Sequence, residues 1–220
     1  MAHLQLRAAD GHIFSAYLAK PEGAIRGGVV VVQEIFGVTG HIERVADQYA
    51  AQGYLSIAPA LFDRQQRGVN LPYDDGGVAK GFALAQKADP AGLLADLTAS
   101  IYAVAHGRPV GMVGYCWGGA VVYRAGCKTN IAAGVVYYGG GITRFLNDTP
   151  RCPMLFHFGE QDAHIPLSDV EKIRAAFPEG EYHLYAAGHG FNCPARDSFN
   201  AAAAHLAFGR TLDFFRKHVG

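Results

Sequence analysis

The chain has 220 residues, of which half are hydrophobic and 17% charged, so it is long enough for one well-buried domain and short for two. Lysine plus arginine and aspartate plus glutamate both number 19, which excludes the basic excess typical of nucleic-acid or anionic-membrane binders. The N-terminus lacks the pattern of a signal peptide, and no apolar run approaches a membrane span. We therefore expect a single domain over residues 1–220, located in the cytoplasm, with no nucleic-acid or membrane partner.

Turn-forming residues divide the chain into predicted strands that alternate with predicted helices, without repeats or low-complexity linkers. The β-branched run over 28–33 predicts a strand buried on both faces of a sheet. Thr39 is a candidate N-cap for the helix that follows this strand. We predict strands over 12–19, 28–33, 54–58, 109–113, 131–138, 154–159 and 181–186. We predict helices over 39–52, 78–88, 91–106, 118–127, 166–177 and 197–218, and a surface loop over 63–77.

This alternation predicts an α/β fold, in which a mostly parallel, twisted sheet of about eight strands carries helices on both faces. In sheets of this kind, ligands bind beyond the carboxyl ends of the strands. The residues that directly follow the predicted strands are therefore the first candidates for a functional site.

The segment Gly114-Tyr115-Cys116-Trp117-Gly118 joins a predicted strand to a predicted helix. It has the G-x-C-x-G form of a nucleophile elbow, with sulfur in place of the usual serine oxygen. Flanking glycines suit a tight turn whose nucleophile sits in strained backbone geometry, and a helix N-terminus favours the thiolate. The alternative interpretation is an inert cysteine buried at a glycine-rich helix start.

Two residues downstream of Cys116 complete the order nucleophile, acid, histidine that is typical of elbow hydrolases. Asp162 comes just after the predicted strand 154–159, and His189 follows the predicted strand 181–186. His189 would take the thiol proton, and Asp162 would orient the imidazole ring. Each residue alone has a simpler explanation as a turn aspartate or a solvated loop histidine. Three residues in this order, each after a predicted strand, favour the catalytic interpretation.

The segment Gln33–Gly37 follows the first buried strand, where elbow enzymes take one oxyanion-hole donor. The backbone N–H groups of Ile35 and Trp117 are therefore the candidate oxyanion hole. Glu34 would point toward the same site, where a carboxylate near a thiol raises the thiol pKa or accepts its proton. The alternative for Glu34 is a surface ion pair.

These segments together make the chain resemble the dienelactone hydrolase family. The resemblance covers nearly the whole chain and includes Ala187–Phe191, Tyr137-Tyr138-Gly139 and the C-terminal segment 210–214. It implies the α/β-hydrolase fold and a Cys116–His189–Asp162 triad without metal or organic cofactor. It also implies that Glu34 holds the resting cysteine as a thiol and helps to deprotonate it when substrate binds. The implied reaction opens an enol lactone through an acyl-cysteine intermediate to a maleylacetate-type product, as in aromatic hydrocarbon catabolism.

The chain departs from the family at the residues that hold the substrate. The best-known members of the family carry an arginine and a tyrosine in the helix after the 63–77 loop, whereas this chain offers Lys80 as the nearest cation. Cys193 stands where a second arginine is expected, and the next arginine is Arg196. Arg64 matches a family position. The candidate substrate-binding residues are therefore Phe36, Arg64, Lys80 and Arg196, and each cation has the alternative of a solvated surface residue.

Two other functions remain open at this point. A carboxylesterase or thioesterase could use the same triad on a neutral acyl substrate, and a binding or thiol-sensing protein could keep the elbow thiol without catalysis. The four cysteines form no C-x-x-C pair and the histidines show no metal-ligand spacing, so we expect free thiols and no metal site. The expected partner is a small ester or lactone, and the expected assembly is a monomer or small homo-oligomer.

Overall fold

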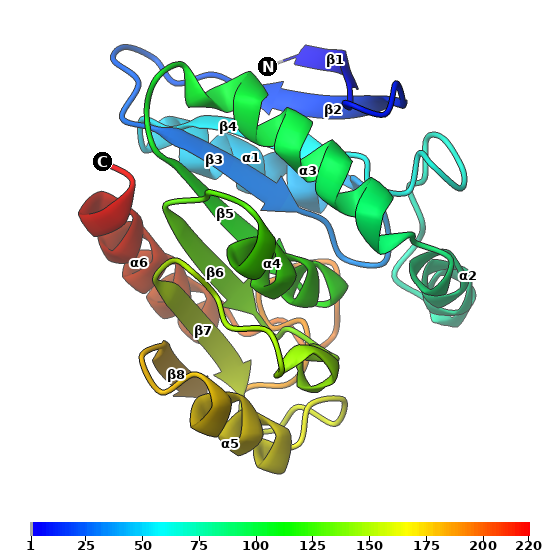
Figure 1. Cartoon of the computed structure of the whole chain (residues 1–220). Coiled ribbons are helices and arrows are strands. Elements are labelled where there is room, and N and C mark those ends of the chain that lie inside the picture. The colour runs from blue at the N-terminus through cyan, green and yellow to red at the C-terminus, as the bar shows by residue number, and fades with distance from the viewer. Residues whose placement is uncertain (1) are drawn as a thin grey trace.

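The computed structural model describes residues 2–220, and strands alternate with helices along most of this range (Figure 1). The strands are β1 (Ala2–Arg7), β2 (Ile13–Ala19), β3 (Gly28–Val32), β4 (Leu55–Pro59), β5 (Val110–Tyr115), β6 (Ala133–Tyr137), β7 (Met154–Gly159) and β8 (Glu181–Tyr185). The helices are α1 (Gly40–Ala51), α2 (Asp75–Gln86), α3 (Pro90–Ala105), α4 (Trp117–Lys128), α5 (Leu167–Ala176) and α6 (Ala201–His218), with a 3-10 turn η1 (Ile142–Phe145).

All eight strands form one twisted sheet in the order β1-β2-β4-β3-β5-β6-β7-β8. The pairs β1–β2 and β2–β4 are antiparallel, and the five remaining pairs are parallel. Helices α3, α4 and α5 cover one face of the sheet, and α1 and α6 cover the other (Figure 1). The prediction of a mostly parallel sheet of about eight strands with helices on both faces is confirmed.

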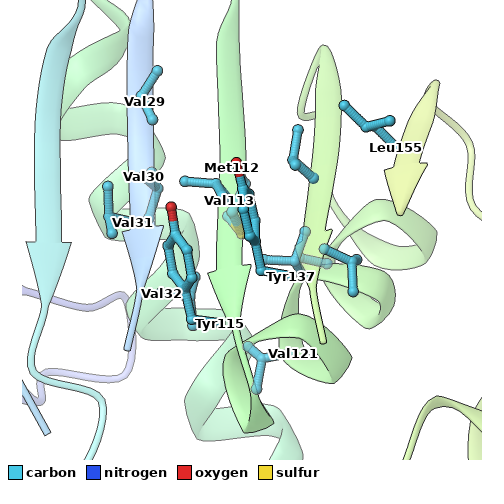
Figure 2. Packing of buried hydrophobic residues seen from close by; sticks show 14 of the residues in the cluster. Val29, Val30, Val31, Val32, Met112, Val113, Tyr115, Val121, Tyr137 and Leu155 are labelled. Carbon is cyan, nitrogen blue, oxygen red and sulfur yellow. The ribbon is translucent and has the colours of Figure 1, made fainter. Parts of the chain in front are cut away.

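The core lies in the middle of the sheet, where strands are covered on both faces. Every residue of β3 is buried, which is what its unbroken run of valines predicts. Figure 2 shows these valines beside Met112 and Val113 of β5, with Tyr137 of β6 next along the sheet. On the α1 and α6 face, the Tyr49 ring packs against Phe208 and Phe215. None of the helices within residues 2–220 combines the length and the hydropathy that crossing a bilayer needs.

Some element boundaries differ from the prediction. β1 was not predicted because it is an edge strand whose residues are exposed or half-buried, which leaves a weak hydrophobic signal. η1 was not predicted either. α2 begins at Asp75, inside the predicted loop, because the Asp74 carboxylate caps the N–H of Gly77 at 2.8 Å. α6 begins at Ala201 rather than 197.

The cap of α1 also differs from the prediction. Thr39 occupies the N-cap position, but its hydroxyl makes no capping hydrogen bond. Thr39 Oγ1 lies 2.8 Å from the hydroxyl of Tyr73 instead. Thr39 therefore connects the start of α1 to the segment that leads into α2.

Helix α4 approaches the ends of β3 and β5 so closely that no side chain fits between them. A Cβ atom on Gly114 would lie 2.1 Å from the carbonyl oxygen of Gly118. A Cβ atom on Gly118 would lie 2.4 Å from the carbonyl oxygen of Gln33. Because these neighbours are backbone atoms, they cannot move aside without shifting a strand or the helix.

We predict that Gly114→Ala lowers the free energy of unfolding by about 2–3 kcal/mol, because the added methyl group overpacks a backbone contact. The matched control is Gly209→Ala in α6, where a Cβ meets nothing within 4 Å and helix propensity favours alanine. Urea unfolding of both variants provides the measurement. Equal stability of the two variants would contradict the close approach of α4 to β5.

Candidate active site

Cys116 occupies the turn between β5 and α4 and has φ +54° and ψ −120°. A positive φ is uncommon for a residue with a side chain and persists only where the surroundings hold it. Here the Cys116 N–H donates to the carbonyl of Tyr137 at 3.0 Å, and its own carbonyl accepts from the N–H of Gly119 at 2.9 Å. The strand–turn–helix geometry is that of a nucleophile elbow, which raises the thiol above the end of the sheet.

The three residues predicted as a triad lie together in hydrogen-bond geometry. His189 Nε2 lies 3.1 Å from the sulfur of Cys116, and His189 Nδ1 lies 2.8 Å from Asp162 Oδ2. They follow β5, β7 and β8, whose carboxyl ends meet at the same edge of the parallel sheet. In this arrangement the imidazole can act as a base toward the thiol, and the carboxylate can orient the imidazole.

Asp162 is fixed independently of the histidine. Its Oδ1 atom accepts hydrogen bonds from the backbone N–H groups of His164 at 2.8 Å and Ile165 at 3.1 Å. The side chain is completely buried, and Oδ2 is directed at His189. Asp162 is thus both the turn residue that its sequence context suggests and the partner that orients the imidazole ring.

Glu34 is buried beside Arg196. Its carboxylate is 1% exposed, with Oε1 at 3.5 Å from Nη1 of Arg196 and with Oε2 lacking a hydrogen-bond partner among residues 2–220. Burial raises the pKa of Glu34 to about 7, although the positive charge of Arg196 opposes the rise. The surface ion pair considered as an alternative is excluded, because this carboxylate is inside the protein.

The protonation of the thiol and of the imidazole depends on the same burial. Burial, followed by the negative charge of Glu34, raises the pKa of Cys116 to about 12, while the Trp117 N–H opposes the rise. Burial also lowers the pKa of His189 below its usual value, although Asp162 opposes the shift. The site without substrate therefore favours a neutral thiol beside a neutral imidazole.

Two backbone donors lie where an oxyanion hole is expected. Ile35 and Trp117 both line the cavity into which Cys116 opens. No backbone carbonyl outside the helices and strands of residues 2–220 accepts the Ile35 N–H, and the Trp117 N–H lies at the Cys116 sulfur, so both can donate to an oxygen of a molecule bound at that sulfur. α2 supports the Ile35 segment closely, since a Cβ on Gly81 would lie 2.3 Å from the Ile35 carbonyl oxygen.

The four candidate substrate-binding residues occupy different places. Phe36 is buried in the cavity wall, and the guanidinium carbon of Arg196 lies 5.8 Å from the centre of its ring. Arg196 lines the same cavity. Lys80 is exposed on α2 and is not among the lining residues. Arg64 is also not among them.

Arg64 serves the fold instead. Its Nε and Nη2 atoms donate to both carboxylate oxygens of Asp96, at 2.8 and 2.7 Å, and Nη1 lies 2.8 Å from Asp10. Asp96 is completely buried in α3. Arg64 therefore connects α3 to the segment between the first two strands. Because three of its nitrogens already contact carboxylates, it has little hydrogen-bonding capacity left for a substrate.

Other polar residues around the site were not predicted. The imidazole of His164 packs edge-on against that of His189 with ring centres 5.0 Å apart, and His164 lines the cavity. Behind Glu34, the ligand-type atoms of Glu34, His41 and Cys193 lie within 4.8 Å of one another. These atom types also bind zinc, so these three residues could hold a metal ion. Sequence spacing does not reveal the group because its members come from three separate segments.

The cavity has a volume of about 670 Å³, in the range of pockets that bind small organic molecules. It begins at the sulfur of Cys116 and extends between α2, α3, α4 and the η1 segment. Its walls are mainly apolar, and the lining includes Arg124 and Arg144, which the sequence did not single out.

Comparison with known proteins agrees with this geometry. The family model described as "Dienelactone hydrolase family" matches residues 14–219. The carboxymethylenebutenolidase of Pseudomonas putida is 34% identical over 222 residues, covering 96% of this chain and 94% of the relative. The crystal structure of a Klebsiella pneumoniae protein, provisionally named a dienelactone hydrolase, is 27% identical and superposes with a TM-score of 0.85 over 99% of this chain and 100% of that one.

A second solved structure supports the fold alone. It is a promiscuous phosphotriesterase from metagenomic libraries, described as dienelactone hydrolase-like, at 18% identity and a TM-score of 0.80, covering 100% of this chain and 99% of that one. Family match, full-length relatives and fold all agree. The chain is therefore a hydrolase of the α/β-hydrolase fold and belongs to the dienelactone hydrolase family.

Proposed function

We propose that the chain is a cysteine hydrolase that opens enol lactones, or cleaves related esters, through an acyl-cysteine intermediate. The observation that carries the proposal is the chain of contacts from the Cys116 sulfur through His189 to Asp162, at 3.1 and 2.8 Å. The name carboxymethylenebutenolidase of the 34% identical relatives supports an enol lactone as the substrate class.

Substrate binding activates the thiol in this proposal. An anionic group on the substrate competes with Glu34 for Arg196, whose present contact with Oε1 is long at 3.5 Å. Without its cation, the Glu34 carboxylate becomes a stronger base and helps to take the proton of Cys116. The resulting thiolate pairs with His189. Activation that depends on substrate keeps the resting cysteine in its less reactive thiol form.

The bond changes then follow the geometry of the elbow. The thiolate attacks the carbonyl carbon, and the N–H groups of Ile35 and Trp117 hold the negative oxygen. The carbon–oxygen bond of the ring breaks as the thioester forms, and the released enolate takes up the proton that Glu34 removed from the thiol. Water attacks the thioester while His189 accepts its proton, and that proton then returns to the departing thiolate. A thiolate nucleophile suits enol leaving groups because they are weakly basic.

A neutral ester or thioester is the second candidate substrate. The mainly apolar walls of the cavity favour it, because a hydrophobic acyl group would be buried there. The same triad would act on both substrates, so the charge of the preferred substrate distinguishes the two candidates.

We predict that Cys116→Ala lowers kcat/KM on an enol lactone at least about 10³-fold, because the nucleophile is lost. Cys116→Ser should retain a small residual rate through its oxygen. The control is Cys152→Ala, which removes a buried thiol outside the triad and should leave the rate unchanged within about twofold. Initial rates on a dienelactone provide the measurement, and full activity of Cys116→Ala would exclude the mechanism.

We predict that Arg196→Gln raises KM for an anionic lactone about tenfold or more, because a charge-assisted contact is lost. The effect on a neutral aryl ester of similar size should be much smaller. Arg108→Gln, an exposed arginine away from the cavity, is the control. If wild type prefers the neutral ester and Arg196→Gln affects both substrates equally, the neutral-ester function replaces the lactone function.

We predict that Glu34 makes the protein less stable as pH rises from 4.5 to above 7. Below its ordinary pKa of 4.5, the carboxyl is protonated in both folded and unfolded chains. At higher pH the unfolded chain releases this proton first, since burial holds the folded pKa at about 7. The difference of about 2.5 pKa units corresponds to about 3 kcal/mol in favour of unfolding.

Glu34→Gln removes this titration. The free energy of unfolding of the variant should therefore rise relative to that of wild type as pH increases from 4.5 to above 7. Urea unfolding of both proteins at several values between pH 4.5 and 8 gives the comparison. Glu22→Gln in an exposed loop is the control and should follow wild type throughout. A difference between Glu34→Gln and wild type that stays constant with pH would refute a buried, high-pKa carboxyl.

A further inference from the structure

The cavity extends well beyond the reacting atoms. Helix α4 contributes Trp117, Ala120, Val121 and Arg124 to its lining, a spacing that places all four on one side of the helix. At 1.5 Å per residue, Arg124 lies about 11 Å along the helix axis from Trp117, the neighbour of the nucleophile. The far end of the cavity therefore lies about two helical turns from the sulfur.

The far end carries two arginines that have no assigned role. Arg124 on α4 and Arg144 on η1 both line the cavity, and Phe145, the sequence neighbour of Arg144, packs against Arg124. Among residues 2–220, neither guanidinium forms an ion pair or a side-chain hydrogen bond. The nearby Asp148 is engaged by Lys128 at 2.7 Å. Both cations are thus free to meet an anion.

Arg124 is also partly removed from water. Its Nε atom is buried without a hydrogen-bond partner, and its guanidinium carbon lies 4.7 Å from the centre of the Phe145 ring. Burying a donor without a partner costs free energy that a bound acceptor would recover. The aromatic ring supports the guanidinium, and an arginine held in this way can pair with a planar acceptor such as a carboxylate.

The charge of the lining has one sign. Among the described residues that line the cavity there are three arginines, Arg124, Arg144 and Arg196, and no aspartate or glutamate. Arg196 stands at the reacting end beside Glu34, and the other two stand at the far end. Between the two ends the walls are mainly apolar. A cavity lined in this way favours a molecule with a negative group at its distal end and an apolar middle.

We propose that Arg124 and Arg144 form a distal anion subsite, and that the substrates are elongated esters or lactones with a carboxylate about 10 Å from the cleaved carbonyl, the span of two helical turns. The proposal rests on the proposed function for the reacting end. Binding of the distal carboxylate holds the apolar middle against α4 and places the carbonyl at Cys116. The subsite therefore selects substrates by length as well as by charge.

The test uses monoaryl esters of succinic, suberic and sebacic acid, each beside a neutral alkanoic aryl ester of equal chain length. Wild type should prefer the anionic member at the long lengths. A preference at the succinate length would come from Arg196 at the reacting end and should not depend on Arg124. Arg124→Gln should lose about tenfold in kcat/KM on the sebacate ester, mainly through KM, because one charge-assisted contact is lost. Arg144→Gln, at an exposed position, gives the second variant, and Arg108→Gln gives the control.

Turnover of the neutral esters tests the proposed function without the distal subsite, so failure of one can be distinguished from failure of the other. Cys116-dependent hydrolysis without preference for long anionic esters, or with no effect of either variant, overturns the subsite and leaves the proposed function standing. If no ester is turned over, a binding measurement tests the subsite instead. Trp117 is the single tryptophan and lines the cavity, so its fluorescence reports on sebacate bound to the Cys116→Ser protein. Saturable binding weakened about tenfold by Arg124→Gln supports the subsite, and no saturable change overturns it.

Discussion

The close approach of α4 to the ends of β3 and β5 is the constraint on which the rest of the site depends. Gly114 and Gly118 leave only backbone between these elements, and the turn between them forces Cys116 into a positive φ. The thiol consequently stands clear of the sheet. The loops that follow β7 and β8 end at the same edge and bring Asp162 and His189 to the sulfur.

Burial gives this arrangement its chemical character. Glu34, Cys116 and His189 are all largely removed from water. Burial therefore raises the pKa of the two acids and lowers that of the histidine, and in each case the neutral form is favoured. In the proposed mechanism, a site of this kind stays in its less reactive form until the charge around it changes. There the anionic group of a substrate at Arg196 makes that change, which would link recognition of the substrate to formation of the nucleophile.

Much of the site could be predicted from the sequence because its residues follow strands with clear ends. The triad residues and the Gln33–Gly37 segment needed only the order of elements and the elbow glycines. Arg64 could not be judged in this way, since its partners Asp96 and Asp10 are distant in sequence. Arg124 was missed because a single arginine within a helix has the pattern of a solvated residue. The start of α2 was missed because Gly76 and Gly77 lie in its first turn, and glycine has a low helix propensity.

The central claim is that Cys116 becomes covalently acylated during turnover. The most direct test is an acid quench of the enzyme during hydrolysis of an aryl ester, followed by mass spectrometry of its peptides. The account predicts an acyl group on the peptide that contains Cys116, removed by hydroxylamine as a thioester is, and absent from Cys116→Ala. Turnover with no acyl group on that peptide, at a rate that Cys116→Ala retains, would contradict the account.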